Sequence, residues 1–209
     1  MITVSPAAPV DVEEATAVLA GAFRDDPVMS AFVGGDPDER ERRLTHLLGV
    51  LVRTGLSSGA VDLARAEEGP AVLGVAVWSA PGNRDDGLLH TIRNIGSYLR
   101  AFGPGGLRRA ARLQRAIDSA RPGEAHWYLG AIGATPAGRG RGIGSALLRA
   151  RLETIEAPAY LEASTERSAA LYARFGFDRI GTVAGFPEPV RPVAMWRPGA
   201  PVRPGRSGS

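Results

Sequence analysis

Residues 127–148 read WYLGAIGATPAGRGRGIGSALL, and this stretch decides the expected fold because a glycine-rich turn joins a strand to a helix. The part up to Pro136 is typical of a strand, and the part from Ile143 is typical of a helix. The first N–H groups of a helix lack internal partners, and the helix dipole favours an anion there. Glycines let those N–H groups approach phosphate oxygens, and Arg139 and Arg141 add forked donors. The turn therefore predicts a pyrophosphate-binding site.

Two other glycine-rich anion loops do not fit this turn. A Walker loop requires a lysine before Ser or Thr, and the chain contains no lysine. A dinucleotide fingerprint requires glycines at its first, third and sixth positions, and no set of glycines in residues 138–147 has that spacing. The remaining pattern is Arg-x-x-Gly-x-Gly over residues 139–144. In a chain with 27 glycines a structural turn stays an alternative, but the position between a strand and a helix favours an anion.

The composition limits the class of protein. The chain of 209 residues is long enough for one domain with a full core, and its 44% hydrophobic and 22% charged residues are ordinary for a globular protein. The longest apolar run, Ala71–Trp78, is too short to cross a membrane, and the N-terminus does not resemble a secretory signal. We therefore expect a cytoplasmic protein without a membrane interaction.

The residue inventory excludes several chemistries. The absence of cysteine excludes disulfides and thiolate nucleophiles, and the absence of lysine excludes a Schiff base. His46, His90 and His126 have no metal-ligand spacing, so we expect no metal site. The net charge is +3 and the pI about 9.9, with arginines repeated over residues 93–115. A nucleic-acid surface is one interpretation, but we expect the solvated faces of two helices and no nucleic-acid partner.

The hydrophobic pattern predicts one α/β (α+β) domain over residues 1–197. Asp11 and Glu14 are spaced for a capping box before the first helix, and residues 25–27 are expected to end that helix. Residues 84–121 form an expected helical insertion, broken at residues 103–106, and residues 198–209 form an expected disordered tail. The other expected helices begin near residues 38, 143 and 165, and strands are expected near residue 4 and at residues 60–66, 71–78, 126–135, 159–163, 177–184 and 193–196.

A second motif lies downstream, where residues 171–177 read LYARFGF, with the pattern Leu-Tyr-x-x-x-Gly-Phe. Together with the loop at residues 139–144, it resembles the GCN5-related N-acetyltransferase (GNAT) family. The resemblance implies acetyl-CoA as co-substrate. It also implies a single GNAT-like domain with a mixed, mostly antiparallel central sheet of about six to seven strands, flanked by helices, in which the cofactor strand splays from its neighbour.

The resemblance also assigns residues to the cofactor. Backbone groups of Ile132, Gly133 and Ala134 on the splayed strand would pair with the pantetheine arm and polarise the thioester carbonyl. The pyrophosphate would bind the loop formed by Arg139, Gly140, Arg141, Gly142, Ile143, Gly144 and Ser145.

Four stretches are similar to the puromycin N-acetyltransferase branch of that family; they are residues 22–27, 126–129, 160–164 and 194–197. Many relatives carry Asn where this chain has Ser168, and His-Pro where it has Arg121-Pro122. These departures concern the substrate pocket and leave CoA binding unaffected.

The resemblance implies that Tyr172 protonates the departing thiolate, because a phenol stays protonated at neutral pH; a purely core role is the alternative. Glu162 is the candidate general base, directly or through water, and an exposed carboxylate or a helix cap is the alternative. Trp78 and Trp127 are candidates for stacking on an aromatic acceptor, although wall packing is the commoner role. The insertion is expected either to cover the acceptor site or to form a dimer contact.

These residues predict an enzyme that transfers acetyl directly from acetyl-CoA to a primary amine of a small molecule, such as an antibiotic-like compound. The alternatives are an enzyme acting on protein or peptide amines and a non-catalytic module that binds CoA or nucleic acid. We expect a monomer or a homodimer.

Overall fold

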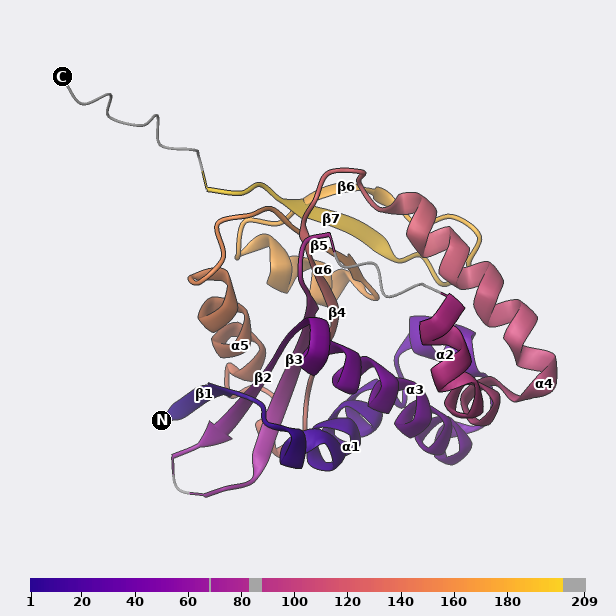
Figure 1. Ribbon diagram of the computed structural model, residues 1–209. Coiled ribbons are helices and arrows are strands. Elements are labelled where there is room, and N and C mark those ends of the chain that lie inside the picture. Colours follow the sequence, from indigo (N-terminus) through magenta and orange to yellow (C-terminus); the bar gives the residue numbers. More distant parts are fainter. Residues whose placement is uncertain (68, 83–87, 201–209) are drawn as a thin grey trace.

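The computed structural model describes residues 1–67, 69–82 and 88–200 and contains one seven-stranded sheet (Figure 1). The strand order is β1-β2-β3-β4-β5-β7-β6, and every neighbouring pair is antiparallel except β4 and β5. The expected mixed, mostly antiparallel sheet is therefore confirmed. The strands are β1 (Ile2–Pro6), β2 (Gly59–Ala66), β3 (Val72–Ser79), β4 (Trp127–Ala134), β5 (Ala159–Ala163), β6 (Asp178–Thr182) and β7 (Val193–Arg197).

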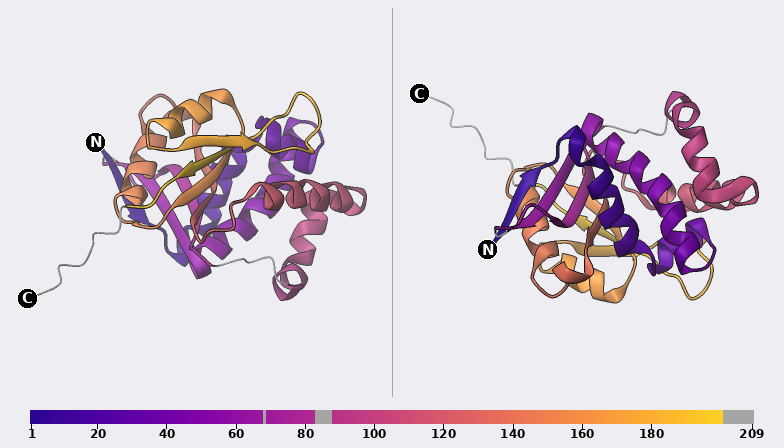
Figure 2. Two further views of the ribbon diagram at one scale, coloured as in Figure 1. Left: turned by 90° about the horizontal axis from the view of Figure 1, so that it is seen from above. Right: turned by 90° about the horizontal axis from the view of Figure 1, so that it is seen from below.

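Helices cover both faces of the sheet (Figure 2). On one face α1 (Val12–Phe23) and α3 (Pro37–Ser58) pack on β3, and α2 (Pro27–Val33) and α4 (Leu88–Ala120) pack on them in turn. On the other face α5 (Ile143–Leu152) packs on β1 to β4, and α6 (Glu166–Ala173) packs on β5 and β7. Each face has its own apolar cluster, because side chains alternate between the two faces along each strand.

The Asp-Pro pair at residues 26–27 begins a helix that the sequence analysis did not predict. It ends α1 as expected, but Asp26 also caps α2 by accepting a hydrogen bond from the Met29 N–H at 2.9 Å. Pro27 occupies the first position of α2, where its missing N–H costs nothing. The same two residues therefore end one helix and start the next.

The predicted capping box of α1 is wrong, because its two carboxylates bond elsewhere. Asp11 accepts from the Ala8 N–H at 2.7 Å and pairs with Arg65 of β2 at 2.8 Å. Glu14 accepts from the Val72 N–H at 2.9 Å. Both carboxylates therefore tie the start of α1 to the chain beside it and to the sheet.

The helix α4 consists of two helical segments that meet at a kink. Gly103 has φ of 65°, which a residue with a side chain rarely adopts, and Pro104 follows it. The predicted break at residues 103–106 is therefore confirmed. Residues 84–87 of the expected insertion lie outside the described residues.

Residues 198–200, the first of the expected disordered tail, are held by a backbone hydrogen bond. Ala200 donates its N–H to the carbonyl of Glu156 at 2.8 Å, so residues 198–200 run beside the loop before β5. Residues 201–209 lie outside the described part of the chain. None of the helices described is both long and apolar enough to cross a bilayer.

Candidate active site

The strands β4 and β5 separate soon after they meet. They pair only at Trp127 with Ala159 and at Tyr128 with Tyr160. The strand β4 stays paired with β3 as far as Ala134, with a bulge between the pairs made by Leu129 and Ala131. Bulges turn a strand away from its neighbour. From Leu129 onward, the edge of β4 that faces β5 therefore has no strand partner among the described residues, which confirms the expected splay.

One cavity of about 1810 Å³ fills this opening and continues under α4. It begins at the glycine-rich loop, follows β4 between α1 and α6, and ends among α2, α3 and α4. Its volume exceeds the ~300–1,000 Å³ typical of a single small-ligand pocket. The cavity is therefore large enough to hold two substrates end to end.

The glycine-rich loop presents a helix start to one end of this cavity. Gly140 and Gly142 have φ of 76° and 77°, a conformation that favours glycine, and Gly142 directly precedes the first residue of α5. The first N–H groups of α5 have no partner within the helix. The loop residues that line the cavity are Gly138, Arg139, Gly140, Gly142, Ile143, Gly144 and Ser145.

The remaining predicted cofactor residues divide between the cavity and the surface. Ile132, Gly133 and Ala134 line the cavity along β4. Arg141, in contrast, is exposed and lies outside the cavity lining. A helix N-terminus, an unpaired strand edge and Arg139 together fit a pyrophosphate linked to an amide-containing arm, as in CoA.

Tyr172 of α6 lines the cavity and is also part of the core. The residue is 7% exposed, and its ring packs edge-on against Phe177, with the ring centroids 6.2 Å apart. Burial raises the pKa of the Tyr172 hydroxyl, and the charge of Asp26 raises it further. The phenol therefore keeps its proton at neutral pH, and it reaches the cavity from the apolar core.

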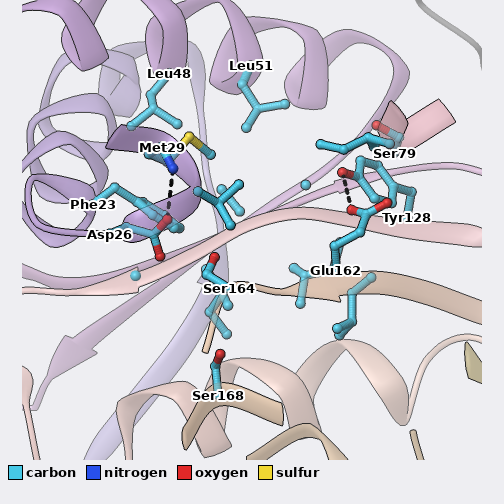
Figure 3. Close-up of a pocket in the computed structure, with 18 of the residues that line it drawn as sticks. Phe23, Asp26, Met29, Leu48, Leu51, Ser79, Tyr128, Glu162, Ser164 and Ser168 are labelled. Carbon is cyan, nitrogen blue, oxygen red and sulfur yellow. Dashed lines mark hydrogen bonds between the residues drawn. The ribbon is translucent and has the colours of Figure 1, made fainter. Parts of the chain in front are cut away.

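Glu162 lines the cavity from β5, where its side chain is only 7% exposed (Figure 3). The Tyr128 hydroxyl donates a hydrogen bond to Glu162 Oε2 at 2.8 Å, and Arg121 Nε lies 3.8 Å from Oε1. Burial raises the pKa of Glu162, opposed by the Arg121 charge and the Tyr128 hydrogen bond. A raised pKa makes the carboxylate a stronger base, which suits a group that must accept a proton.

The structure excludes both alternatives for Glu162. It is buried, so it is not an exposed carboxylate. The cap of α6 is Thr165, whose hydroxyl accepts a hydrogen bond from the Ser168 N–H at 3.2 Å. Ser168 returns a hydrogen bond to the Thr165 backbone and also lines the cavity.

The two tryptophans do not face the cavity, contrary to the expectation. Trp78 is fully buried in the cluster under α5, and Trp127 packs at the edge of the same cluster beneath the Arg151 guanidinium. Neighbouring side chains on a strand point to opposite faces, and both residues point to the α5 face. The side chains that do reach the cavity, Tyr128 and Glu162, point to the face covered by α1 to α4.

Asp26 is a cavity residue that was not predicted as a site residue, although it lies in the predicted helix break and in the family-like stretch at residues 22–27. Burial raises the pKa of its carboxyl group, opposed by hydrogen bonds from the backbone of Met29 and the side chain of Ser164. Figure 3 shows the Asp26 carboxylate near the Ser164 hydroxyl. The Asp-Pro pair is a signal for the start of a helix, but it does not indicate that the carboxylate faces a cavity.

The far end of the cavity is mainly apolar on the side of α1 to α3. Phe23, Met29, Leu48 and Leu51 contribute side chains there (Figure 3). The helix α4 adds Tyr98 and Phe102, which stack with ring centroids 6.2 Å apart, and Leu107. Within the described residues, no group of three or more His, Asp or Glu side chains could hold a metal ion.

Comparisons with known proteins agree with this arrangement. Residues 109–179 match the family described as Acetyltransferase (GNAT) domain. A solved structure from Corynebacterium glutamicum, described as histone acetyltransferase HPA2 and related acetyltransferase, is 29% identical with a TM-score of 0.73, over 95% of this chain and 97% of that one.

More distant structures share the fold. A polyamine N-acetyltransferase of Drosophila melanogaster is 21% identical with a TM-score of 0.61, over 94% of this chain and 98% of that one. Arylalkylamine N-acetyltransferase 2 of Aedes aegypti is 12% identical with a TM-score of 0.61, over 93% and 97% of the two chains. Together with the loop, the splayed strands and the shared fold, the match of residues 109–179 to the GNAT acetyltransferase domain leads to one conclusion: the chain is an acetyl-CoA-dependent N-acetyltransferase.

Proposed function

We propose that the chain acetylates the primary amine of a small molecule by direct transfer, with both substrates bound at once. The observation that carries this proposal is the single continuous cavity, which joins the glycine-rich loop to the chamber under α4. Tyr172 and Glu162 both line it between these two ends. The absence of cysteine also agrees with transfer without a thiol acyl-enzyme.

Acetyl-CoA supplies the acetyl group as a thioester. The N–H groups of the β4 backbone at residues 132–134 would hold the thioester carbonyl and stabilise negative charge on its oxygen. Glu162 accepts the proton that the attacking amine must lose, directly or through water. Tyr172 donates its proton to the sulfur that leaves, because its raised pKa keeps the hydroxyl protonated.

The acceptor chamber favours an amine that carries an apolar portion. Phe23, Met29, Leu47 and Leu51 form its wall on the side of α1 to α3, and α4 lies along the other side. We propose that α4 acts as a cover over this chamber. A small amine with an aromatic or alkyl portion fits such a covered chamber better than an extended peptide does.

A panel of amines with acetyl-CoA tests the proposal. It should contain phenylethylamine, tryptamine, agmatine, spermidine, puromycin and a lysine-containing peptide, because the 29% identical structure is described as a histone acetyltransferase. We expect the highest kcat/KM for an amine with an apolar portion. A higher kcat/KM for the peptide would contradict the small-molecule proposal. Binding of acetyl-CoA without turnover on any amine would support a non-catalytic module.

The role of Glu162 is tested with Glu162→Gln, which keeps the size of the side chain and removes its basicity. General-base catalysis typically contributes ~10²–10⁴-fold. We therefore expect kcat to fall at least ~100-fold, while the Kd for acetyl-CoA stays unchanged. Unchanged turnover would assign the base elsewhere, and Asp26, the second buried carboxylate of the cavity, would be the next residue to test.

A further inference from the structure

The end of α4 brings a cation to the proposed base. Arg121 directly follows the last residue of α4, and its guanidinium carbon lies 3.8 Å from the centre of the Tyr128 ring. Its Nε is 3.8 Å from Glu162 Oε1, and its Nη1 is 3.9 Å from Asp118 Oδ1. Tyr128 also donates to Glu162, so these two residues hold the carboxylate from two sides.

The two oxygens of Glu162 are held differently. Oε2 is fixed by the Tyr128 hydroxyl at 2.8 Å. Oε1 is buried and has no hydrogen-bond partner within the part of the chain that the structure describes, and the same holds for Arg121 Nε opposite it. A separation of 3.8 Å is too long for a hydrogen bond but short enough for a strong charge interaction in a buried site. Arg121 therefore favours the ionised carboxylate without occupying Oε1 with a hydrogen bond.

The groups that act on Glu162 come from three elements. Tyr128 of β4 and Tyr160 of β5 are neutral phenols, and Asp118 of α4 is a second carboxylate. Among these described neighbours Arg121 is the cation, and an arginine does not lose its charge in a protein. Without it, the buried carboxylate would face only neutral groups and a like charge.

We propose that Arg121 is a positioning residue that keeps Glu162 ionised and oriented for proton transfer. The end of α4 then completes the acid–base site, in addition to covering the acceptor. The proposal rests on the proposed role of Glu162 as general base.

The experiment compares Arg121→Gln and Arg121→Lys with the unaltered enzyme. The acid limb of the pH profile of kcat/KM for the amine reports protonation of the base. Loss of the cation raises the pKa of Glu162, so in Arg121→Gln we expect this limb to move to higher pH by about one pH unit. On the acid side kcat/KM should therefore be about tenfold lower than in the unaltered enzyme, and at high pH it should be equal. Arg121→Lys should restore part of the shift, because it returns the charge without the planar guanidinium.

Arg112→Gln is the matched control, since Arg112 is an exposed arginine of α4 outside the cavity lining. It removes the same charge, and the limb should stay in place. A fall in kcat at every pH in Arg121→Gln, with an unmoved limb, would overturn the proposal and leave Arg121 a packing role. The proposal would also be overturned if Arg112→Gln moved the acid limb as far as Arg121→Gln does.

A direct titration separates this proposal from the proposed function. The infrared carboxyl band of Glu162 is assigned by subtracting the Glu162→Gln spectrum, and it should persist to higher pH in Arg121→Gln. If Glu162→Gln keeps full turnover but the band still shifts, the base assignment fails and the charge coupling stands. If the band does not shift, the proposed role of Arg121 is wrong, whatever the turnover of the variants.

Discussion

At the scale of single residues, the direction of a side chain on its strand decides its chemistry. Trp127 and Tyr128 are neighbours, yet the first packs under α5 and the second reaches the cavity. The same alternation turns Glu162 toward the cavity, while Leu161 and Ala163 on either side enter the core. Tyr172 differs, because on α6 it is at once a core residue and a cavity residue.

Tyr172→Phe tests the acid at this scale. The phenyl ring keeps the packing against Phe177, so folding should be preserved, and only the proton donor is lost. We expect kcat to fall by about 10²-fold or more, in the range of general acid catalysis, with the Kd for acetyl-CoA unchanged. Stopped-flow turnover and calorimetric binding measure the two quantities separately.

The alkaline limb of the pH profile gives a second readout. Burial and Asp26 raise the pKa of Tyr172 above its ordinary value of about 10, so the hydroxyl loses its proton only above that pH. The unaltered enzyme should keep its activity up to at least about pH 10. An alkaline limb near pH 8 that persists in Tyr172→Phe would assign the loss of activity to another group.

At the scale of elements, the position of the cofactor loop depends on how closely α5 packs on β3. A Cβ added to Gly74 of β3 would lie 2.3 Å from Ile143 Cγ2 and 3.0 Å from the Gly133 carbonyl oxygen. Ile143 is the first residue of α5 and Gly133 lies on the cofactor strand. Any side chain at position 74 must therefore displace the helix start or the strand that forms the cofactor site.

Gly74→Ala should destabilise the fold by about 1–3 kcal/mol, the usual cost of overpacking, and should weaken acetyl-CoA binding. Urea unfolding and calorimetry check the two effects. Gly96→Ala is the control, because Gly96 is an exposed residue of α4 and a Cβ added there meets nothing within 4 Å. That change should stabilise the fold by about 0.4–1 kcal/mol and leave binding unaffected. Equal effects of the two changes would contradict the packing argument.

At the scale of the whole molecule, the splay divides the sheet into two parts. The strands β1 to β4 form one part and β5 to β7 the other. In the part of the chain that the structure describes, only the two residue pairs at Trp127 and Tyr128 join them through the sheet. The cavity lies between these parts and is lined from both. A ligand that fills it therefore contacts both parts of the sheet.

Acetyl-CoA should raise the stability of the whole molecule. At 100 times its Kd the gain is ~2.7 kcal/mol, which corresponds to a Tm increase of about 5–11 °C for a chain of this size. ATP is the matched ligand, because it has phosphates but no pantetheine arm to fill the space along β4. ATP should raise Tm far less than acetyl-CoA does at equal concentration. An equal rise would mean that only the glycine-rich loop contributes to binding and that the space along β4 does not.

The sequence by itself determined most elements and one end of the site. The glycine turn before Ile143, the strand at residues 159–163 and the break at Gly103 were predictable, because each follows from local periodicity or local backbone conformation. The helix α2 was not predicted, since an Asp-Pro pair serves equally as a stop and as a start. Seven residues also give too short a pattern to recognise.

The tertiary structure alone decided which side chains meet. Local pattern could not reveal that Trp78 faces α5, that Asp26 lines the cavity, or that Arg121 lies against Glu162, because these depend on the sheet face and on contacts between distant segments. The predicted donor site is built from one continuous stretch of chain, so the sequence alone could predict it. The acceptor chamber is assembled from α1 to α4 and two strands, so only the packing of those elements decided its shape and its charge.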